Sequence, residues 1–169
     1  MSYAPSELVK RAWGTPPRCL AGFNVTPVVE PPDGTFNKLG YFALACTCGG
    51  GSFKVFGYLQ DGELFSAPFS LTCAMCGKSV ELFDIATHGY DAEFGHGYFS
   101  VRSTGTPSEY NCPACRKTDF SAQAGFSYQI EPIEDLGPEN QGRVQDFFDW
   151  FYLDVRCNDC GEYVCASDY

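Results

Sequence analysis

Eight of the ten cysteines in this 169-residue chain form four close pairs. The pairs are Cys46/Cys48, Cys73/Cys76, Cys112/Cys115 and Cys157/Cys160. A Cys-x-x-Cys turn directs two thiolates at one point, and two such turns complete a tetrahedral metal site. Thiolates favour zinc, because this ion is borderline-soft and has no preferred d-electron geometry to satisfy. The spacing therefore predicts structural metal sites.

The residues around each pair support this interpretation. In three pairs a glycine follows the second cysteine: Gly49, Gly77 and Gly161. Glycine readily adopts a positive φ, which lets the backbone turn so that its N–H groups face the sulfurs. Two pairs depart from the pattern. Cys112/Cys115 has Pro113 between the cysteines and Arg116 in place of the glycine, and Cys46/Cys48 has only one intervening residue.

The cysteine pairs also belong to an internal repeat. The segments "CAMCGKSVELFD" (73–84) and "CNDCGEYVCASD" (157–168) share the cysteines, the following glycine, a valine and an aspartate at the same spacing. The other two pairs resemble each other as well, because Phe53 and Phe120 each lie five residues after the second cysteine. The order is opening pair, aromatic strand, closing pair, and then the same again. The chain is therefore predicted to hold two copies of one unit.

Each unit resembles a zinc ribbon, in which two cysteine turns on β-hairpins share one metal ion. The resemblance covers roughly residues 41–84 and 110–168. It implies two structural Zn²⁺ ions, the first held by Cys46, Cys48, Cys73 and Cys76, and the second by Cys112, Cys115, Cys157 and Cys160. Zinc ribbons serve transcription, translation, catalysis and protein interaction, so this resemblance alone does not define a function.

A second grouping of the cysteines stays open at the level of sequence. The segments "CAMCG" and "CPAC" together resemble the two loops of rubredoxin, which hold iron. That grouping would place Cys73/Cys76 and Cys112/Cys115 around one metal ion. Cys46/Cys48 and Cys157/Cys160 would then form the other group. An iron site of this kind absorbs visible light, whereas a zinc site is colourless.

The rest of the sequence predicts a mainly β fold, or small α+β fold, with one or two short helices. Aromatic and β-branched residues with partial alternation predict strands at 41–46, 52–59, 69–73, 80–85, 98–103, 120–130, 152–157 and 162–167. Helices are predicted at 5–13 and 138–151. The second helix would carry an apolar stripe that we interpret as core, formed by Val144, Phe147, Phe148 and Phe151.

These elements predict three regions. Residues 1–40 form an N-terminal arm with a short helix, and its proline-rich part from residue 14 is expected to have little regular structure. Residues 41–97 form the first zinc-ribbon-like unit and a linker loop, and residues 98–169 form the second unit with an insert at 130–150. The two unpaired cysteines, Cys19 and Cys165, are interpreted as buried apolar residues.

Charge restricts the class of partner. The formal net charge is −10, which disfavours nucleic acids and anionic membranes and favours a basic protein. No apolar run has the length of a signal peptide or a membrane span. We therefore expect a soluble cytoplasmic protein, and in a reducing compartment clustered cysteines are more often metal ligands than disulfides.

One segment could carry chemistry. "DIATHGYDAEFGHG", residues 84–97, holds both histidines and three acids: Asp84, His88, Asp91, Glu93 and His96. These residues could hold a third, catalytic metal ion with an open position for water, with Glu93 as general base. In the alternative interpretation the segment is a polar linker, in which His88 hydrogen-bonds a carbonyl near the first metal site and Asp91 forms an Asx turn.

Three functional hypotheses follow. The leading one is a non-enzymatic, zinc-binding, acidic interaction module that masks a basic partner, as a bacterial immunity protein neutralises a toxin or nuclease. It draws on the net charge and on the acids of the insert: Glu131, Glu134, Asp135 and Glu139. The alternative is a metal-dependent hydrolase built on residues 84–97. A nucleic-acid-associated zinc ribbon fits the motif but not the sign of the charge, and no catalytic residue is assigned.

Overall fold

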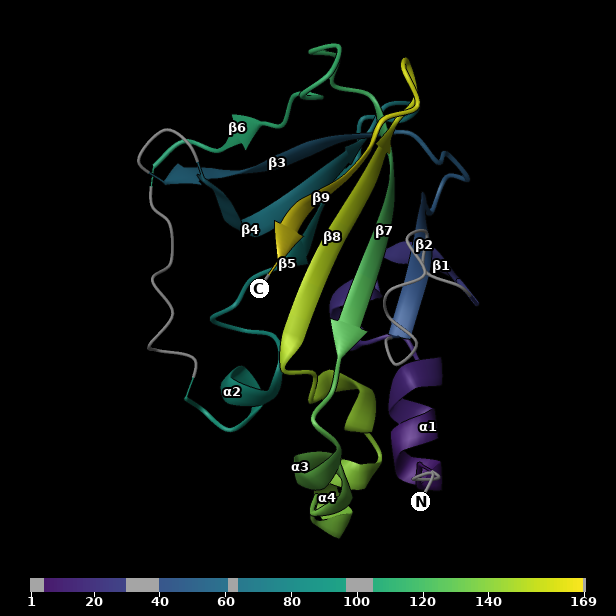
Figure 1. Cartoon of the computed structure of the whole chain (residues 1–169), viewed down its shortest axis with the longest axis vertical. Helices are drawn as coiled ribbons and strands as arrows, with labels where there is room; N and C mark the ends of the chain where they lie inside the picture. The colour runs from purple at the N-terminus through teal and green to yellow at the C-terminus, as the bar shows by residue number, and fades with distance from the viewer. Residues whose placement is uncertain (1–4, 30–39, 61–63, 97–104, 169) are drawn as a thin grey trace.

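The computed structural model describes residues 5–29, 40–60, 64–96 and 105–168 (Figure 1). In these residues the strands form one sheet, and all its strand pairs are antiparallel. The first half of the chain contributes β1 (Phe23–Pro27), β2 (Gly40–Cys46), β3 (Phe53–Gln60), β4 (Leu64–Cys73) and β5 (Ser79–Phe83). The second half contributes β6 (Ser108–Glu109), β7 (Phe120–Ser127), β8 (Trp150–Cys157) and β9 (Tyr163–Asp168). The mainly β prediction is confirmed.

Most predicted strands are present, and the structure has two further strands, β1 and β6, that were not predicted. The strand predicted at 98–103 lies outside the described residues. β1 was not predicted, because it lies in the proline-rich arm. It pairs antiparallel with β2 from Phe23↔Cys46 to Pro27↔Phe42, and its proline stands at the end of an edge strand, where no ladder hydrogen bond is lost. The expectation that this part of the arm has little regular structure is therefore wrong.

Two three-stranded ribbons carry the repeat. β3, β4 and β5 pair in sequence order, and so do β7, β8 and β9. The register is equivalent in the two halves, because Phe53 pairs with Cys73 and Phe120 pairs with Cys157. Phe53 and Phe120 are also partners of each other, where β3 meets β7. In Figure 1 β3 and β4 run across the top of the molecule, β7 and β8 run down it, and the two ribbons meet at one end.

The halves also share a strand pairing and a core. β2 precedes the first cysteine turn but pairs with β7 of the second half. Between the ribbons lies an aromatic cluster in which Phe83 stacks on Phe151 with ring centroids 4.2 Å apart, and Phe148 packs edge-on against Phe126 at 4.8 Å. Phe69 from β4 completes the stack. Aromatic rings from both halves thus form one continuous core.

The helices gather at the end of the molecule opposite the cysteine turns (Figure 1). Helix α1 (Glu7–Gly14) begins after Ser6, whose Oγ accepts a hydrogen bond from the Val9 N–H at 3.4 Å. This helix confirms the prediction at 5–13. The other helical segments are one to two turns long: η1 (Arg18–Leu20), α2 (Tyr90–Glu93), α3 (Ile130–Glu134), α4 (Pro138–Gln141) and η3 (Val144–Asp146). No helix in the described part of the chain has the length and apolarity needed to cross a membrane.

The prediction of one helix over residues 138–151 is wrong. The chain forms α4, turns at Gly142, makes the single turn η3, and enters β8 at Trp150. The predicted apolar stripe is nevertheless core, because all four of its members are buried: Val144, Phe147, Phe148 and Phe151. A turn followed by a strand brings these side chains inward as well as a helix would.

Candidate metal centres

The first cluster of sulfurs lies between two turns of the first ribbon. Cys46 ends β2, Cys73 ends β4, and Cys48 and Cys76 lie in the turns that follow these strands. The Sγ atoms of Cys46 and Cys76 are 3.6 Å apart, and those of Cys48 and Cys73 are 3.7 Å apart. All four sulfurs lie within 4.8 Å of one another, so the group could hold one metal ion.

The second cluster has the same construction. Cys157 ends β8, Cys160 lies in the turn before β9, and Cys112 and Cys115 lie in the turn before β7. The Sγ atoms of Cys112 and Cys160 are 3.6 Å apart, and those of Cys115 and Cys157 are 3.5 Å apart. All four sulfurs also lie within 4.8 Å of one another. The cysteines therefore group within each unit, as the zinc-ribbon resemblance implies. The rubredoxin-like grouping across the units is not found.

Burial alternates within every pair. The first cysteine is buried in all four pairs: Cys46, Cys73, Cys112 and Cys157. The second cysteine is exposed in three pairs and half-buried in the Cys112/Cys115 pair. Each cluster is thus anchored in the core on one side and lies at the surface on the other. Four protein ligands around one ion leave no open position for water, which is the arrangement of a structural site rather than a catalytic one.

The turns need a left-handed backbone at one position. The residue after the second cysteine has φ 95° at Gly49, 75° at Gly77 and 78° at Gly161, which confirms the role expected of these glycines. Arg116 occupies the corresponding position with φ 64°, and it is the one non-glycine residue with positive φ in the described part of the chain. Its N–H donates to the Cys112 carbonyl at 2.8 Å, as the Gly77 N–H donates to that of Cys73 at 2.9 Å.

Backbone N–H groups favour a thiolate in each cluster. The Cys48 N–H lowers the pKa of Cys46 to about 7, and the Cys115 N–H lowers the pKa of Cys112 to about 7. Although the Gly50 N–H lowers the pKa of Cys48, its contact with Cys76 and a partial loss of hydration raise this pKa to about 12. In the second cluster the Lys117 N–H lowers the pKa of Cys115, but loss of hydration and the contact with Cys157 raise it to about 12. Each cluster therefore contains a cysteine that ionises readily to the thiolate, the form that binds metals, beside a thiol that holds its proton.

The predicted third metal site is not formed. Asp84 is buried; its Oδ1 accepts from the Ala86 N–H at 3.0 Å, and its own N–H donates to His88 Nδ1 at 3.0 Å. The Asx turn thus forms at Asp84 rather than Asp91, and His88 contacts an N–H rather than a carbonyl. Burial lowers the pKa of His88, and His96 is exposed. In residues 84–96 no three side chains form a group that could hold a metal, so the described part of this loop lacks the site that the hydrolase hypothesis needs.

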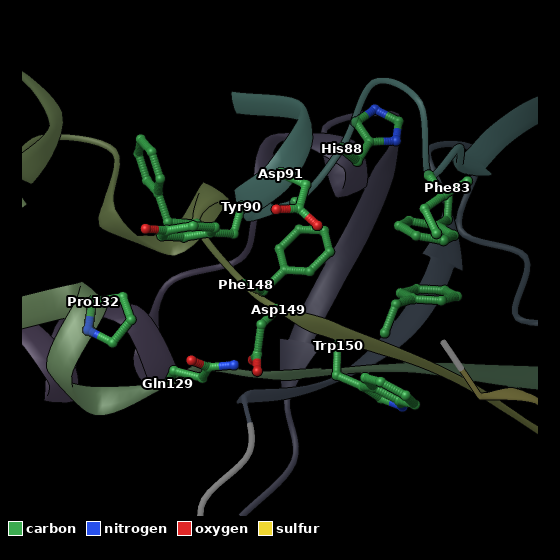
Figure 2. Close-up of a pocket in the computed structure, with 13 residues that line it drawn as sticks. Phe83, His88, Tyr90, Asp91, Gln129, Pro132, Phe148, Asp149 and Trp150 are labelled. Carbon is green, nitrogen blue, oxygen red and sulfur yellow. The ribbon is translucent and has the colours of Figure 1, made fainter. Parts of the chain in front are cut away.

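The same loop lines a cavity of about 410 Å³ on the side of the molecule away from the cysteines. Figure 2 shows Tyr90 and Asp91 on one side of this space and Gln129, Asp149 and Trp150 on the other. The remaining walls come from the aromatic core and from residues next to α2 and α3, among them Phe83, Ile85, His88, Pro132 and Phe148. Of the lining residues that the structure describes, none is a lysine or arginine.

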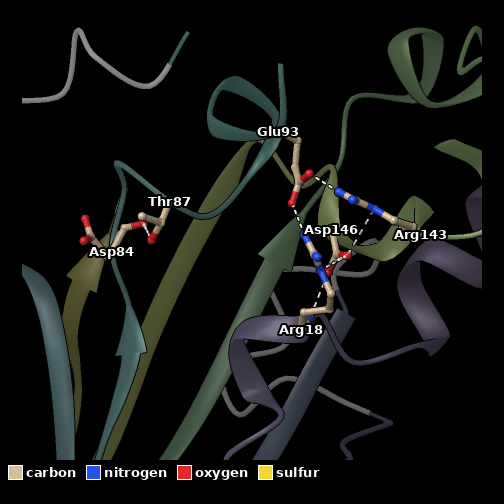
Figure 3. Close-up of polar contacts among 6 residues, drawn as sticks. All are labelled: Arg18, Asp84, Thr87, Glu93, Arg143 and Asp146. Atoms are coloured by element: carbon tan, nitrogen blue, oxygen red, sulfur yellow. Dashed lines mark hydrogen bonds and ion pairs between the residues drawn. The ribbon is translucent and has the colours of Figure 1, made fainter. Parts of the chain in front are cut away.

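Glu93 belongs to a network of ion pairs (Figure 3). Its two carboxylate oxygens contact the guanidinium groups of Arg18 and Arg143. Asp146, which is 3% exposed, contacts Arg18 Nε at 2.7 Å and accepts the Arg18 N–H at 2.8 Å. Both carboxylate oxygens of Glu93 are thus engaged by arginines, which stabilises the structure and leaves neither oxygen open to take a proton as a general base. The network ties the N-terminal segment to the loop and to the insert.

Sequence reasoning did not find the arginines or the aspartate of this network. Arg18 and Asp146 are 128 residues apart, and no spacing or repeat connects them. The interpretation of the two unpaired cysteines is correct for Cys19, which is buried, and wrong for Cys165, which is exposed. Cys165 lies on β9, opposite Asp154 of β8.

The chain matches no protein-family model, no curated protein and no solved structure. Its function is therefore argued from its own geometry and charge.

Proposed function

We propose that this protein is a zinc-binding interaction module in which two structural ions hold an acidic surface for a basic protein partner. The observation that carries the zinc assignment is the convergence of the eight paired cysteines into two groups of four sulfurs, each within 4.8 Å. Four thiolates in a closed tetrahedral site suit zinc better than they suit magnesium, calcium or manganese. The ligands of the first ion are Cys46, Cys48, Cys73 and Cys76, and those of the second are Cys112, Cys115, Cys157 and Cys160.

The ions have a mechanical role in this proposal. Each three-stranded ribbon ends in two tight turns, and the turns hold the buried cysteines beside the core. Structural zinc contributes about 10 kcal/mol or more to the folding of small zinc-finger peptides near neutral pH. One ion in each half would fix the turns and, through them, the register of the strands that lead to the acidic end.

The acidic surface supports the partner assignment. Four carboxylates of the insert are exposed at the end opposite the cysteines: Glu131, Glu134, Asp135 and Glu139. Of the described cations at this end, Arg18 and Arg143 are engaged by Glu93 and Asp146, and Lys10 is engaged by Glu7. The exposed Arg11 of α1 offsets part of the charge of the four insert acids, so this surface keeps a net negative charge. A surface whose charges have one sign attracts a partner of the opposite charge and repels partners of the same charge.

The kind of partner follows from this charge. A basic toxin or nuclease, masked in the cytoplasm by an acidic inhibitor, has the required sign and needs no catalytic group on the inhibitor. Nucleic acids and anionic membranes are negatively charged, as this chain is, and would be repelled. The net charge of −10 and the chain length of 169 residues support an immunity role.

A matched pair of variants tests the partner assignment. One variant replaces three insert acids, Glu131, Asp135 and Glu139, by their amides; the control replaces three exposed acids away from this end by amides: Glu81, Asp159 and Glu162. Immobilised proteins are exposed to a panel of purified basic and acidic proteins at about 50 mM and about 300 mM salt. We expect basic proteins to bind at low salt, and the insert variant alone to lose binding. No binding of basic proteins, or equal losses in both variants, would contradict the proposal.

A further inference from the structure

The cavity beside α2 combines negative charge with aromatic surface. Asp91 and Asp149 are exposed acids at its rim, and Trp150 exposes 44% of its surface next to them. Tyr90 and Phe148 supply further ring surface inside (Figure 2). At about 410 Å³ the space falls in the size range of small-molecule and side-chain sites. A cation placed here would meet ring faces and carboxylates together.

Backbone contacts hold the two sides of the cavity in place. The Tyr90 N–H donates to the Phe148 carbonyl at 2.7 Å and so joins α2 to the segment that enters β8. Gly89 permits this approach, because its φ is 93° and a Cβ there would lie 3.1 Å from the Phe148 oxygen. Asp149 is fixed twice by Ser127: its N–H donates to the Ser127 carbonyl at 3.0 Å, and its Oδ1 accepts from the Ser127 Oγ at 3.1 Å. A positioned site loses less entropy when a ligand binds.

The remaining polar groups do not oppose a cation. Among the described residues that line the cavity there is no lysine or arginine. His88, the basic side chain among them, is half-buried, and burial lowers its pKa and favours the neutral imidazole. Gln129 adds an exposed amide next to Asp149 (Figure 2). Asp91 and Asp149 therefore set the charge that an entering group meets.

We propose that this cavity binds an arginine side chain of the basic partner. The inference rests on the proposed function and names the recognition element within it. A planar guanidinium stacks on aromatic faces while its edge donates to carboxylates, and it is less strongly hydrated than an ammonium group. A second hollow of about 400 Å³ shares Tyr90 and Pro132 with the cavity. Its other walls include Phe94, Glu131, Asp135 and Glu139, so further basic residues of the same segment would follow the arginine across this surface.

The chain contains two tryptophans, Trp13 and Trp150, and this permits a direct test. The zinc-loaded protein is labelled with 5-fluorotryptophan, and Trp13→Phe assigns the two fluorine resonances. The probes are blocked tripeptides Gly-Arg-Gly, Gly-Lys-Gly and Gly-citrulline-Gly, the last being the uncharged isostere of the first. We expect the arginine peptide to shift the Trp150 resonance to saturation and to leave Trp13 unchanged. We expect the lysine peptide to bind more weakly than the arginine peptide. The citrulline peptide should bind at least about tenfold more weakly than the arginine peptide, because citrulline has no positive charge.

Two variants separate the cavity from general attraction to an acidic protein. Asp149→Asn removes a carboxylate that lines the cavity, and Glu134→Gln removes one exposed on α3 that lines neither hollow. We expect Asp149→Asn to weaken arginine binding about tenfold and Glu134→Gln to leave it within about twofold. Equal effects of the two variants, or equal binding of the arginine and citrulline peptides, would overturn the inference. Those results would leave the partner proposal intact, since that proposal is tested separately by the binding of basic proteins to the insert variant and its control.

Discussion

Phe53 and Phe120, the first residues of β3 and β7, are direct partners in the sheet. Each also pairs with the cysteine that ends the next strand of its own ribbon, Cys73 or Cys157. The residues before the two phenylalanines meet as well, because the Ser52 hydroxyl donates to the Asp119 carboxylate. The two repeats are therefore joined next to both sulfur clusters, and this junction makes the stability of one half depend on the other.

The first prediction concerns that dependence. Replacing Cys112 and Cys115 by serine removes two ligands of the second ion. We expect the whole chain to unfold earlier and in one transition, because β2 pairs with β7 and Phe83 stacks on Phe151 across the halves. Calorimetry of the zinc-loaded variant measures this. Two resolved transitions, one at the midpoint of the unmodified protein, would show that the halves fold independently.

The second prediction concerns the left-handed position in the turns. A non-glycine residue in this conformation costs about 1 kcal/mol, so Arg116→Gly should raise the free energy of unfolding by about that amount. The matched change in the opposite direction, Gly77→Ala, should lower it by a similar amount; both residues have positive φ, 64° and 75°. Urea denaturation with zinc bound gives both values. A destabilising Arg116→Gly would indicate that the arginine side chain supports the cluster in another way.

The third prediction concerns pH. Metal binding needs deprotonated thiols, and the pKa values of Cys46 and Cys112 are lowered to about 7. In the metal-free protein these two cysteines are mostly thiolate at about pH 8 and mostly protonated at about pH 6. Each ion should therefore displace roughly one more proton at the lower pH, and zinc affinity should fall as the pH falls. Calorimetric zinc titrations in buffers of different ionisation enthalpy count the protons. A proton count that does not change between these pH values would contradict the assignment.

The fourth prediction concerns the ion pairs around Glu93. Its side chain is 13% exposed, whereas those of Arg18 and Arg143 are 60% and 40% exposed, so solvent screens much of the attraction. We expect Glu93→Gln to destabilise the protein by about 1 kcal/mol and to speed cleavage by trypsin after Arg18, because the N-terminal segment is held less firmly.

A double-mutant cycle with Arg18→Met separates this contact from the others that Glu93 makes. A coupling energy near zero would show that the pair contributes nothing to stability. Lys10→Met is the control for the loss of an exposed cation, since Lys10 pairs with Glu7 within α1.

The metal clusters could be predicted from the sequence because the cysteine pairs are local. A turn of four residues brings two sulfurs together wherever the chain places it, and the shared position of Phe53 and Phe120 revealed which turns belong to one unit. The strands with strong aromatic alternation were found for the same reason. β1 was missed because its sequence carries few such residues, and only its pairing with β2 makes it a strand.

Long-range packing set the limits of prediction. The spacing of Val144, Phe147, Phe148 and Phe151 indicates a buried face but does not distinguish a helix from a turn and a strand that bury the same side chains. The cavity could not be found for a similar reason. Its two rim acids, Asp91 and Asp149, come from different halves of the chain, and the Tyr90–Phe148 hydrogen bond that brings their segments together has no signature in the sequence.

The most direct test of the account is the metal content of the untagged protein and of two cysteine variants, measured element by element per chain. The account predicts two zinc ions in the unmodified protein. It predicts one zinc ion when Cys46, Cys48, Cys73 and Cys76 are all replaced by serine, and one when Cys112, Cys115, Cys157 and Cys160 are replaced. Iron in a coloured protein, two zinc ions retained in either variant, or the loss of both ions from a variant that stays folded would contradict the grouping of the sulfurs on which the proposed function depends.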